Sequence, residues 1–210
     1  MRRDNVFTGW QTDDYERLVV VATFDVANLR KRLVPESVIP EVGTPGSPEA
    51  AVAIIVDPDY ESGSVLFIRR TERHGDPWSG QIALPGGRRS LSDRSFRATA
   101  IRETKEEVGV DLRDHELLGV LSPIYAQTRH MLVVPFVFQL KNHVDTLCNE
   151  EVAESFWIPL SDLTTIPVSE VTVNTQDGSM TTNAYVYHDQ VIWGLTFRII
   201  RTLLDRELIT

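Results

Sequence analysis

Three glutamates stand close together in the middle of the chain, at positions 103, 106 and 107. On an α-helix, residues three and four apart share a face, so Glu103, Glu106 and Glu107 would project from one side. Like charges at this spacing destabilise an isolated helix by roughly a few tenths of a kcal/mol per pair. One interpretation is a solvated helix face on which Arg102 and Lys105 screen the glutamates. The other is a divalent-cation site, because hard carboxylate oxygens suit Mg²⁺ or Mn²⁺, which also bridge to phosphates.

The residues before the glutamates favour the cation site. Gly86 and Gly87 allow the backbone to approach a ligand closely, and the following loop leads into a helix expected over about 93–109. Such a loop-to-helix transition suits phosphate chemistry. Asp93 or Ser95 is the expected N-cap of this helix, and a glycine at position 109 is expected to end it.

The elements that must position these residues are mainly strands. Runs rich in β-branched and aromatic residues predict strands at 50–57, 64–70, 116–125, 131–140 and 153–158. The first two runs are close enough to form a hairpin, and the strands follow one another in hairpin-like succession. The sequence therefore predicts a mixed α/β fold with a mostly antiparallel sheet.

The two ends of the chain predict further helices. Residues 13–33 carry apolar side chains near a helical period, and the proline- and glycine-rich segment 35–50 has the composition of a linker. We therefore predict an N-terminal helical extension and linker over 1–45 and a main domain over 46–210. The extension could cap the site or build a homodimer. The run that begins at residue 184 is expected to form a strand or turn that leads into a C-terminal amphipathic helix from about 192 to 207, with Trp193 and Phe197 on the buried face of that helix.

The overall composition excludes several classes of function. The 210-residue chain has a formal net charge of −9 and a pI near 5.0, which disfavours a general nucleic-acid or membrane-surface binder. Cys148 is the only cysteine, which excludes an intrachain disulfide and a cysteine zinc cluster. The sequence has no apolar run of about 18 residues that could span a bilayer, and no secretory signal pattern at its start. We expect a soluble, cytoplasmic protein.

Residues 86–110 resemble the Nudix box, the signature of the Nudix hydrolase family. The second half of the box matches in full from Arg102 to Val110. In the first half, the family places a glutamate eight residues before this arginine, where the chain has Arg94. A one-residue insertion, counted from Gly87, brings Asp93 to that position instead. Asp93 as the substitute is a hypothesis.

The resemblance implies a fold, a cofactor and a set of metal ligands. The fold would be a Nudix α/β/α sandwich with a mixed sheet, and the cofactor would be Mg²⁺ or Mn²⁺. The ligands would be Glu103, Glu106, Glu107 and the carbonyl group of Gly86. Arg102 would orient the carboxylates through charge-assisted hydrogen bonds.

The same resemblance implies metal-dependent hydrolysis of a diphosphate linkage. The candidates for the general base are Glu106, Glu107 and one acid of the later segment "NEEVAESFWIPL". Glu151 and Glu154 are the candidates there. The alternative, that both are exposed loop charges, stays open.

Two further segments resemble the coenzyme A diphosphatases of the family. They are residues 66–87, which lead into the box, and residues 191–200, "VIWGLTFRII". One departure is Leu84, which stands where this subgroup usually has a phenylalanine. A small-molecule nucleoside diphosphate derivative, with coenzyme A or acyl-coenzyme A first, is therefore the expected substrate.

Arginines at the end of a predicted strand are candidate substrate contacts. Arg69, Arg70 and Arg73 could bind phosphates bidentately, and Gly87 could offer its backbone. The alternative is that the arginines merely end a strand in solvent. Trp78 could stack on an adenine, although packing against the protein is the commoner use of a tryptophan.

Two rival functions stay open at this point. An enzyme with the same chemistry could act on ADP-ribose or a dinucleotide. A non-catalytic Nudix module could bind a nucleotide as a regulatory ligand, and the displaced first glutamate of the box favours that alternative.

Overall fold

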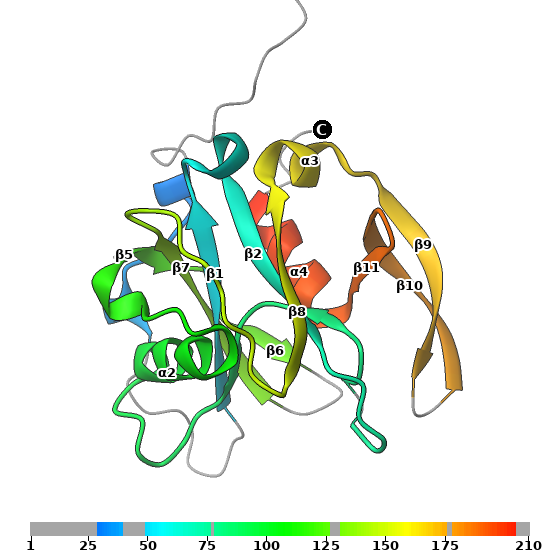
Figure 1. The fold of residues 1–210 in the computed structure, drawn as a ribbon, viewed down its shortest axis with the longest axis horizontal. Coiled ribbons are helices and arrows are strands. Elements are labelled where there is room, and N and C mark those ends of the chain that lie inside the picture. Colours follow the sequence, from blue (N-terminus) through cyan, green and yellow to red (C-terminus); the bar gives the residue numbers. More distant parts are fainter. Residues whose placement is uncertain (1–28, 40–48, 77, 127–130, 176–177, 205–210) are drawn as a thin grey trace, which may run out of the picture.

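The computed structural model of the protein describes residues 29–39, 49–76, 78–126, 131–175 and 178–204 (Figure 1). Within these residues, the main sheet consists of eight strands of different lengths. They are β1 Glu49–Asp57, β2 Ser64–Arg70, β3 Ile82–Ala83, β4 Gly86–Arg88, β5 Glu116–Val120, β6 Ile124–Ala126, β7 Met131–Gln139 and β8 Val152–Pro159.

The main sheet is mixed. Its central order is β3-β2-β1-β7-β5, with β4 beside β1, β6 beside β7 and β8 beside β2. β1 and β7 are parallel from Glu49 opposite Leu132 to Val56 opposite Gln139, whereas the other described pairs of this sheet are antiparallel. β1 and β2 pair as the expected hairpin, with Val56 opposite Val65. The prediction of a mixed α/β fold with a mostly antiparallel sheet is confirmed.

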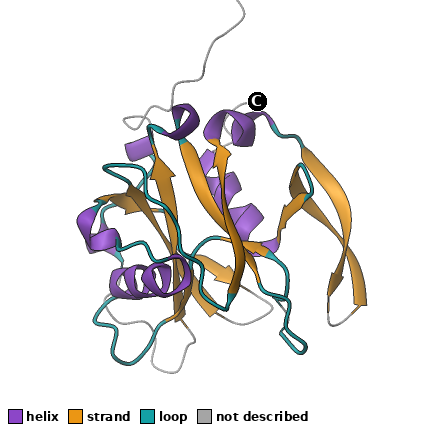
Figure 2. Cartoon of the chain, in the orientation of Figure 1, coloured by secondary structure: helices purple, strands orange, loops and turns teal. Residues whose placement is uncertain are grey.

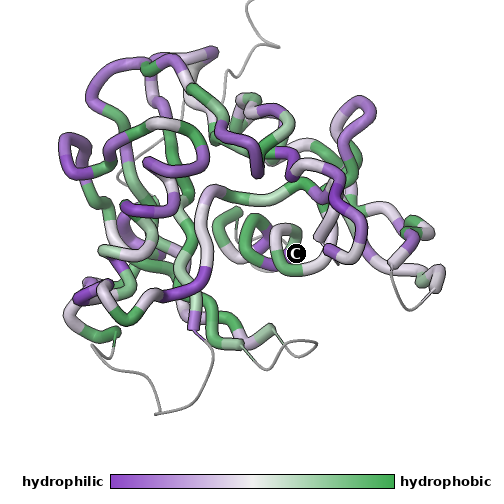
Figure 3. Tube along the Cα trace, turned by 60° about the horizontal axis from the view of Figure 1, so that its bottom comes forward, coloured by the Kyte–Doolittle hydropathy of each residue, from purple (hydrophilic) through white to green (hydrophobic). Residues whose placement is uncertain are grey.

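Helices cover the two faces of the sheet, as the α/β/α prediction requires (Figures 1 and 2). Because side chains alternate along a strand, Ile54 of β1 packs in a core with Phe197, while Ile55 packs in a second core with Phe96. Phe96 begins helix α2 (Phe96–Val108), and Phe197 belongs to helix α4 (Gly194–Leu204). In Figure 3 the hydrophobic colour is concentrated in the strands of the main sheet and in α4, while the connecting loops are largely hydrophilic.

A second, smaller sheet stands beside the main one (Figure 2). It contains β9 (Val168–Thr175), β10 (Gly178–Tyr187) and β11 (Gln190–Trp193) in the order β11-β10-β9, all antiparallel. A short helix, α3 (Leu160–Thr165), connects β8 to it. The sequence predicted only a strand or turn near the end of β10, so most of this sheet was missed.

The predicted N-terminal helix lies mostly in residues 1–28, outside the described residues, as do the linker residues 40–48. Within 29–39, Leu29 belongs to the core, Val34 pairs with Val120, and Glu36–Val38 form a 3₁₀ turn. Among the described residues, no helix has the length and apolar character needed to cross a membrane.

Two expected elements have different bounds. The strand expected at 116–125 is divided between β5 and β6 at the segment that contains Pro123, which has no N–H to donate. The C-terminal helix begins at Gly194, whose positive φ of 62° ends β11, and it is described to Leu204. Trp193 therefore lies on a strand, and its predicted place on the buried helix face is wrong. Phe197 is buried as expected.

Candidate active site

Helix α2 carries the glutamates, and its two ends are defined by specific residues. Ser95 is the N-cap, with an extended backbone and a side chain that accepts a hydrogen bond from the amide of Ala98 at 3.1 Å. Gly109 has a left-handed φ of 74°, and its amide donates to the carbonyl of Lys105. Asp93, the other candidate N-cap, lies before the helix and instead accepts hydrogen bonds from Arg102.

Asp93 is a buried carboxylate that binds Arg102. Its Oδ1 accepts from Nε of Arg102 at 3.0 Å, and its Oδ2 accepts from Nη2 at 2.8 Å. The amide of Ser90 and the hydroxyl of Thr99 also donate to Oδ2, at 2.9 and 3.0 Å. The hydrogen bonds from Arg102, helped by those from Ser90 and Thr99, lower the pKa of Asp93 to about 2. Asp93, the acid reached by counting from Gly87 with a one-residue insertion, therefore pairs with Arg102.

Arg102 joins Asp93 to two of the glutamates. Its Nη1 lies 2.8 Å from Oε1 of Glu103 and 3.0 Å from Oε2 of Glu106, while Nη2 donates to the carbonyl of Arg88 at 3.1 Å. The hydrogen bond to Asp93 and the contact with Glu103 raise the pKa of Arg102, so the guanidinium stays charged. One arginine thus fixes the positions of several carboxylates.

Glu107 is the most buried of the three glutamates, with 2% of its surface exposed. Its Oε2 accepts from the amide of Gly86 at 2.8 Å, and its Oε1 lies 3.8 Å from Nη1 of Arg70. Burial, together with the negative charges of Glu103 and Glu151, raises the pKa of Glu107 to about 8. Burial also raises the pKa of Glu103. These carboxylates therefore need more positive charge than Arg70 and Arg102 supply.

The glycine pair of β4 makes room for this group. A Cβ atom on Gly87 would lie 2.5 Å from the carboxyl carbon of Glu103, closer than real contacts allow. On Gly86, which has a φ of 151°, a Cβ would lie 2.4 Å from the backbone oxygen of Ala51. Position 86 requires glycine for the pairing with β1, whereas a side chain at position 87 would displace the carboxylate of Glu103.

The donor set fits a hard divalent cation. In the described part of the chain, no three His, Cys, Asp or Glu side chains are already gathered as a ligand group, because Glu103 and Glu106 instead contact Arg102. Yet three carboxylates share one helix face, and two of them have pKa values raised by burial. A bound cation would offset the cost of burying these negative charges close together, so Glu103, Glu106 and Glu107 are suitable Mg²⁺ or Mn²⁺ ligands.

The two later acids have different surroundings. Glu151 is exposed, and its charge contributes to the raised pKa of both Glu103 and Glu107, which places it near them. Glu154 instead forms an ion pair with Arg69 at 2.9 Å. Of the two predicted acids, the structure brings Glu151 to the acidic group.

The three candidate arginines separate in space. Arg70 extends between Glu107 and Asp76, with an Nη2-to-Oδ2 distance of 3.4 Å to the latter. Arg73 donates to the carbonyl of Glu150 at 2.9 Å. Arg69, which precedes Arg70 on β2, lines a neighbouring pocket to which Asp76 also contributes.

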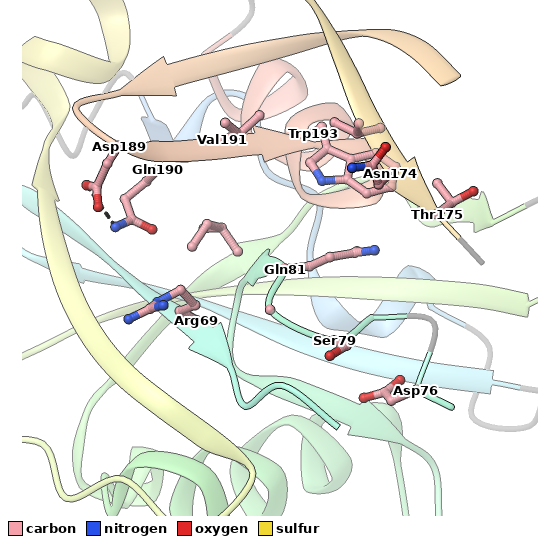
Figure 4. Close-up of a pocket in the computed structure, with 13 residues that line it drawn as sticks. Arg69, Asp76, Ser79, Gln81, Asn174, Thr175, Asp189, Gln190, Val191 and Trp193 are labelled. Atoms are coloured by element: carbon pink, nitrogen blue, oxygen red, sulfur yellow. Dashed lines mark hydrogen bonds between the residues drawn. The ribbon is translucent and has the colours of Figure 1, made fainter. Parts of the chain in front are cut away.

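This pocket lies between the β2–β3 connection and the small sheet, and its volume is about 560 Å³ (Figure 4). Its lining consists of Arg69, Asp76, Ser79, Gly80, Gln81, Ile82, Val173, Asn174, Thr175, Asp189, Gln190, Val191 and Trp193. Trp78 is partly buried in the same connection and is not part of the lining; its amide donates to Asp76 Oδ1 at 3.0 Å.

Sequence reasoning missed the contribution of the small sheet to this pocket. The available signal was the Asp177-Gly178 pair between two runs rich in valine and threonine, which is typical of a β-hairpin.

Comparison with known proteins identifies the family. The sequence model of the NUDIX domain matches residues 46–177, more than half of the chain. The chain belongs to the Nudix hydrolase family. The matched range contains α2 and β4, so the acidic group of this Nudix protein lies within the family's shared domain.

Individual proteins are similar to this chain in sequence or in fold. The chain is 44% identical over 107 residues to an uncharacterized protein of Schizosaccharomyces pombe, an alignment that covers 47% of this chain and 32% of that protein. It is 30% identical over 170 residues to an uncharacterized Nudix hydrolase, NudL, of Yersinia enterocolitica, covering 80% of this chain and 86% of the relative. A MutT/nudix family protein from Enterococcus faecalis has a similar fold, with a TM-score of 0.51 and 20% identity over 97% of this chain and 76% of that one.

Proposed function

We propose that this Nudix protein is a Mg²⁺- or Mn²⁺-dependent hydrolase that cleaves the diphosphate linkage of a nucleoside diphosphate derivative. The observation that carries the proposal is the group of Glu103, Glu106 and Glu107 on one face of α2. Arg102 contacts the first two of these glutamates, and the amide of Gly86 donates to the third. A regulatory binding module would not need three carboxylates at this electrostatic cost.

The residues of the site divide into holding and reacting groups. The cation would be held by Glu103, Glu106, Glu107 and the carbonyl group of Gly86. Asp93 positions Arg102 through its hydrogen bonds. The bound metal would neutralise phosphate charge and lower the pKa of a water molecule. Glu106 and Glu151, which are more exposed than Glu107, can accept a proton from a water molecule that attacks phosphorus.

Coenzyme A or acyl-coenzyme A is the first candidate substrate. The support is the resemblance of residues 66–87 and 191–200 to the coenzyme A diphosphatases, despite the leucine at position 84. Residues 66–87 contain Arg69 and Arg70, of which Arg70 contacts Glu107 and Arg69 lines the neighbouring pocket. The first segment therefore reaches the acidic group, and the second contributes Val191 and Trp193 to the neighbouring pocket.

The substrate is tested by incubating the purified protein with coenzyme A, acetyl-coenzyme A, ADP-ribose, NADH and diadenosine polyphosphates. Each is supplied with Mg²⁺, with Mn²⁺ or with a chelator. We expect 3′,5′-ADP and 4′-phosphopantetheine from coenzyme A in the presence of metal. AMP and ribose 5-phosphate from ADP-ribose alone would replace the coenzyme A assignment. The absence of cleavage of every compound would contradict the hydrolase proposal and leave a nucleotide-binding module.

A further inference from the structure

The pocket beside the acidic group is built from side chains that the proposed chemistry does not use. Strand β11 contributes three of them, Gln190, Val191 and Trp193, while Ile192 is fully buried in the core. Trp193 of β11 and Asn174 of β9 line the pocket from the small sheet, and Gln81 lines it from the β2–β3 connection (Figure 4). The pocket thus combines an aromatic surface with carboxamide groups.

The charges of the lining indicate what kind of group the pocket accepts. Its charged residues are Arg69, Asp76 and Asp189. Arg69 pairs with Glu154 at 2.9 Å. This hydrogen bond raises the pKa of Arg69, and the negative charge of Asp189 makes a smaller contribution in the same direction. The lining therefore carries no excess of positive charge, which disfavours a phosphate and favours an uncharged polar group.

The pocket is connected to the acidic group through a single residue. Asp76 of the lining lies 3.4 Å from Arg70, whose other nitrogen lies 3.8 Å from Glu107. A substrate whose phosphates lie at the glutamates would pass Arg70 and place its next portion in this pocket.

We infer that the pocket binds the nucleobase of the substrate, with the Trp193 ring as a stacking surface and Asn174 and Gln81 as hydrogen-bonding groups. Every base has a π-face that stacks on an aromatic side chain, and carboxamides match the donor and acceptor pattern of a base edge. The volume of about 560 Å³ lies in the range of small-molecule sites. The inference rests on the proposed function for the position of the phosphates.

The test separates binding from turnover. Titration calorimetry compares AMP, ribose 5-phosphate and 4′-phosphopantetheine on the wild type, Trp193→Ala, Trp193→Phe and Asn174→Ala. We expect AMP to bind best, Trp193→Ala to weaken AMP binding roughly ten-fold, and Trp193→Phe to retain most of it. Asn174→Ala, at an exposed position, should weaken it too, and provides a second variant if Trp193→Ala does not fold. Val186→Ala, on an exposed position of β10, is the control and should match the wild type.

Three outcomes would overturn the inference: AMP that does not bind, AMP binding unchanged in folded Trp193→Ala or Asn174→Ala, or a loss confined to 4′-phosphopantetheine. For any diphosphate that is cleaved, Trp193→Ala should raise KM and leave kcat unchanged. Because AMP binding needs no hydrolysis, failure of the proposed function would appear separately, as absence of cleavage with AMP binding intact.

Discussion

At the scale of single residues, Asp93 decides how the chain departs from the family signature. Arg94 stands in the acid's place by simple counting, yet the side chain that contacts Arg102 is Asp93. The aspartate is shorter than a glutamate, and its burial beside Ser90 and Thr99 lets both carboxylate oxygens be used. Sequence counting gave two possible registers, and only the three-dimensional contact distinguishes them.

Replacing Asp93 by asparagine should destabilise the protein in a pH-dependent way. The pKa of Asp93 is lowered from 3.8 to about 2, so its stabilising effect is fully present above pH 4 or so and is lost as the pH falls toward 2. At pH 7 we expect Asp93→Asn to cost about 2 kcal/mol of unfolding free energy, measured by urea denaturation. The difference from wild type should shrink in acid.

The matched control is Asp145→Asn, at an exposed aspartate, which should change the unfolding free energy by less than about 0.5 kcal/mol. Equal stability of Asp93→Asn and the wild type at pH 7 would show that the Asp93–Arg102 pair is not a structural requirement.

At the scale of elements, β4 contacts both helix α2 and strand β1 of the sheet. Its two glycines face different neighbours, since Gly86 packs on the backbone of β1 while Gly87 faces the carboxylate of Glu103. The helix itself was predictable, because its N-cap, its terminal glycine and its glutamates are local features. The small sheet was missed despite its hairpin signal, because β9 has no fully buried residue that would mark it as part of a core.

The two glycines should respond differently to alanine. Gly86→Ala forces a Cβ to within 2.4 Å of a backbone oxygen at a φ of 151°, so we expect a clear loss of thermal stability. Gly87→Ala meets only the end of the flexible Glu103 side chain, which can move. It should fold with near wild-type stability but bind Mn²⁺ more weakly, as followed by calorimetry. Unchanged Mn²⁺ binding in Gly87→Ala would argue against Glu103 as a ligand.

At the scale of the whole molecule, the site joins segments that are far apart in sequence. The acidic group uses α2, β4, the end of β2 and the beginning of β8, while the adjacent pocket adds β9 and β11 (Figure 1). The sequence predicted that the glutamates of α2 share one face, since they are close together in sequence. It misplaced Trp193, because the apolar run 191–200 suits a strand or a helix equally well until the positive φ of Gly194 separates them.

The central claim is that the glutamates of α2 hold the cation that permits diphosphate hydrolysis. The most direct measurement is the kcat of Glu106→Gln with Mg²⁺ on the diphosphate that the wild type cleaves, beside Glu170→Gln on the exposed part of β9 as control. We predict that Glu106→Gln keeps the wild-type fold and melting temperature and loses about 100-fold or more in kcat, while Glu170→Gln is unchanged. A folded Glu106→Gln protein with near wild-type turnover would contradict the account.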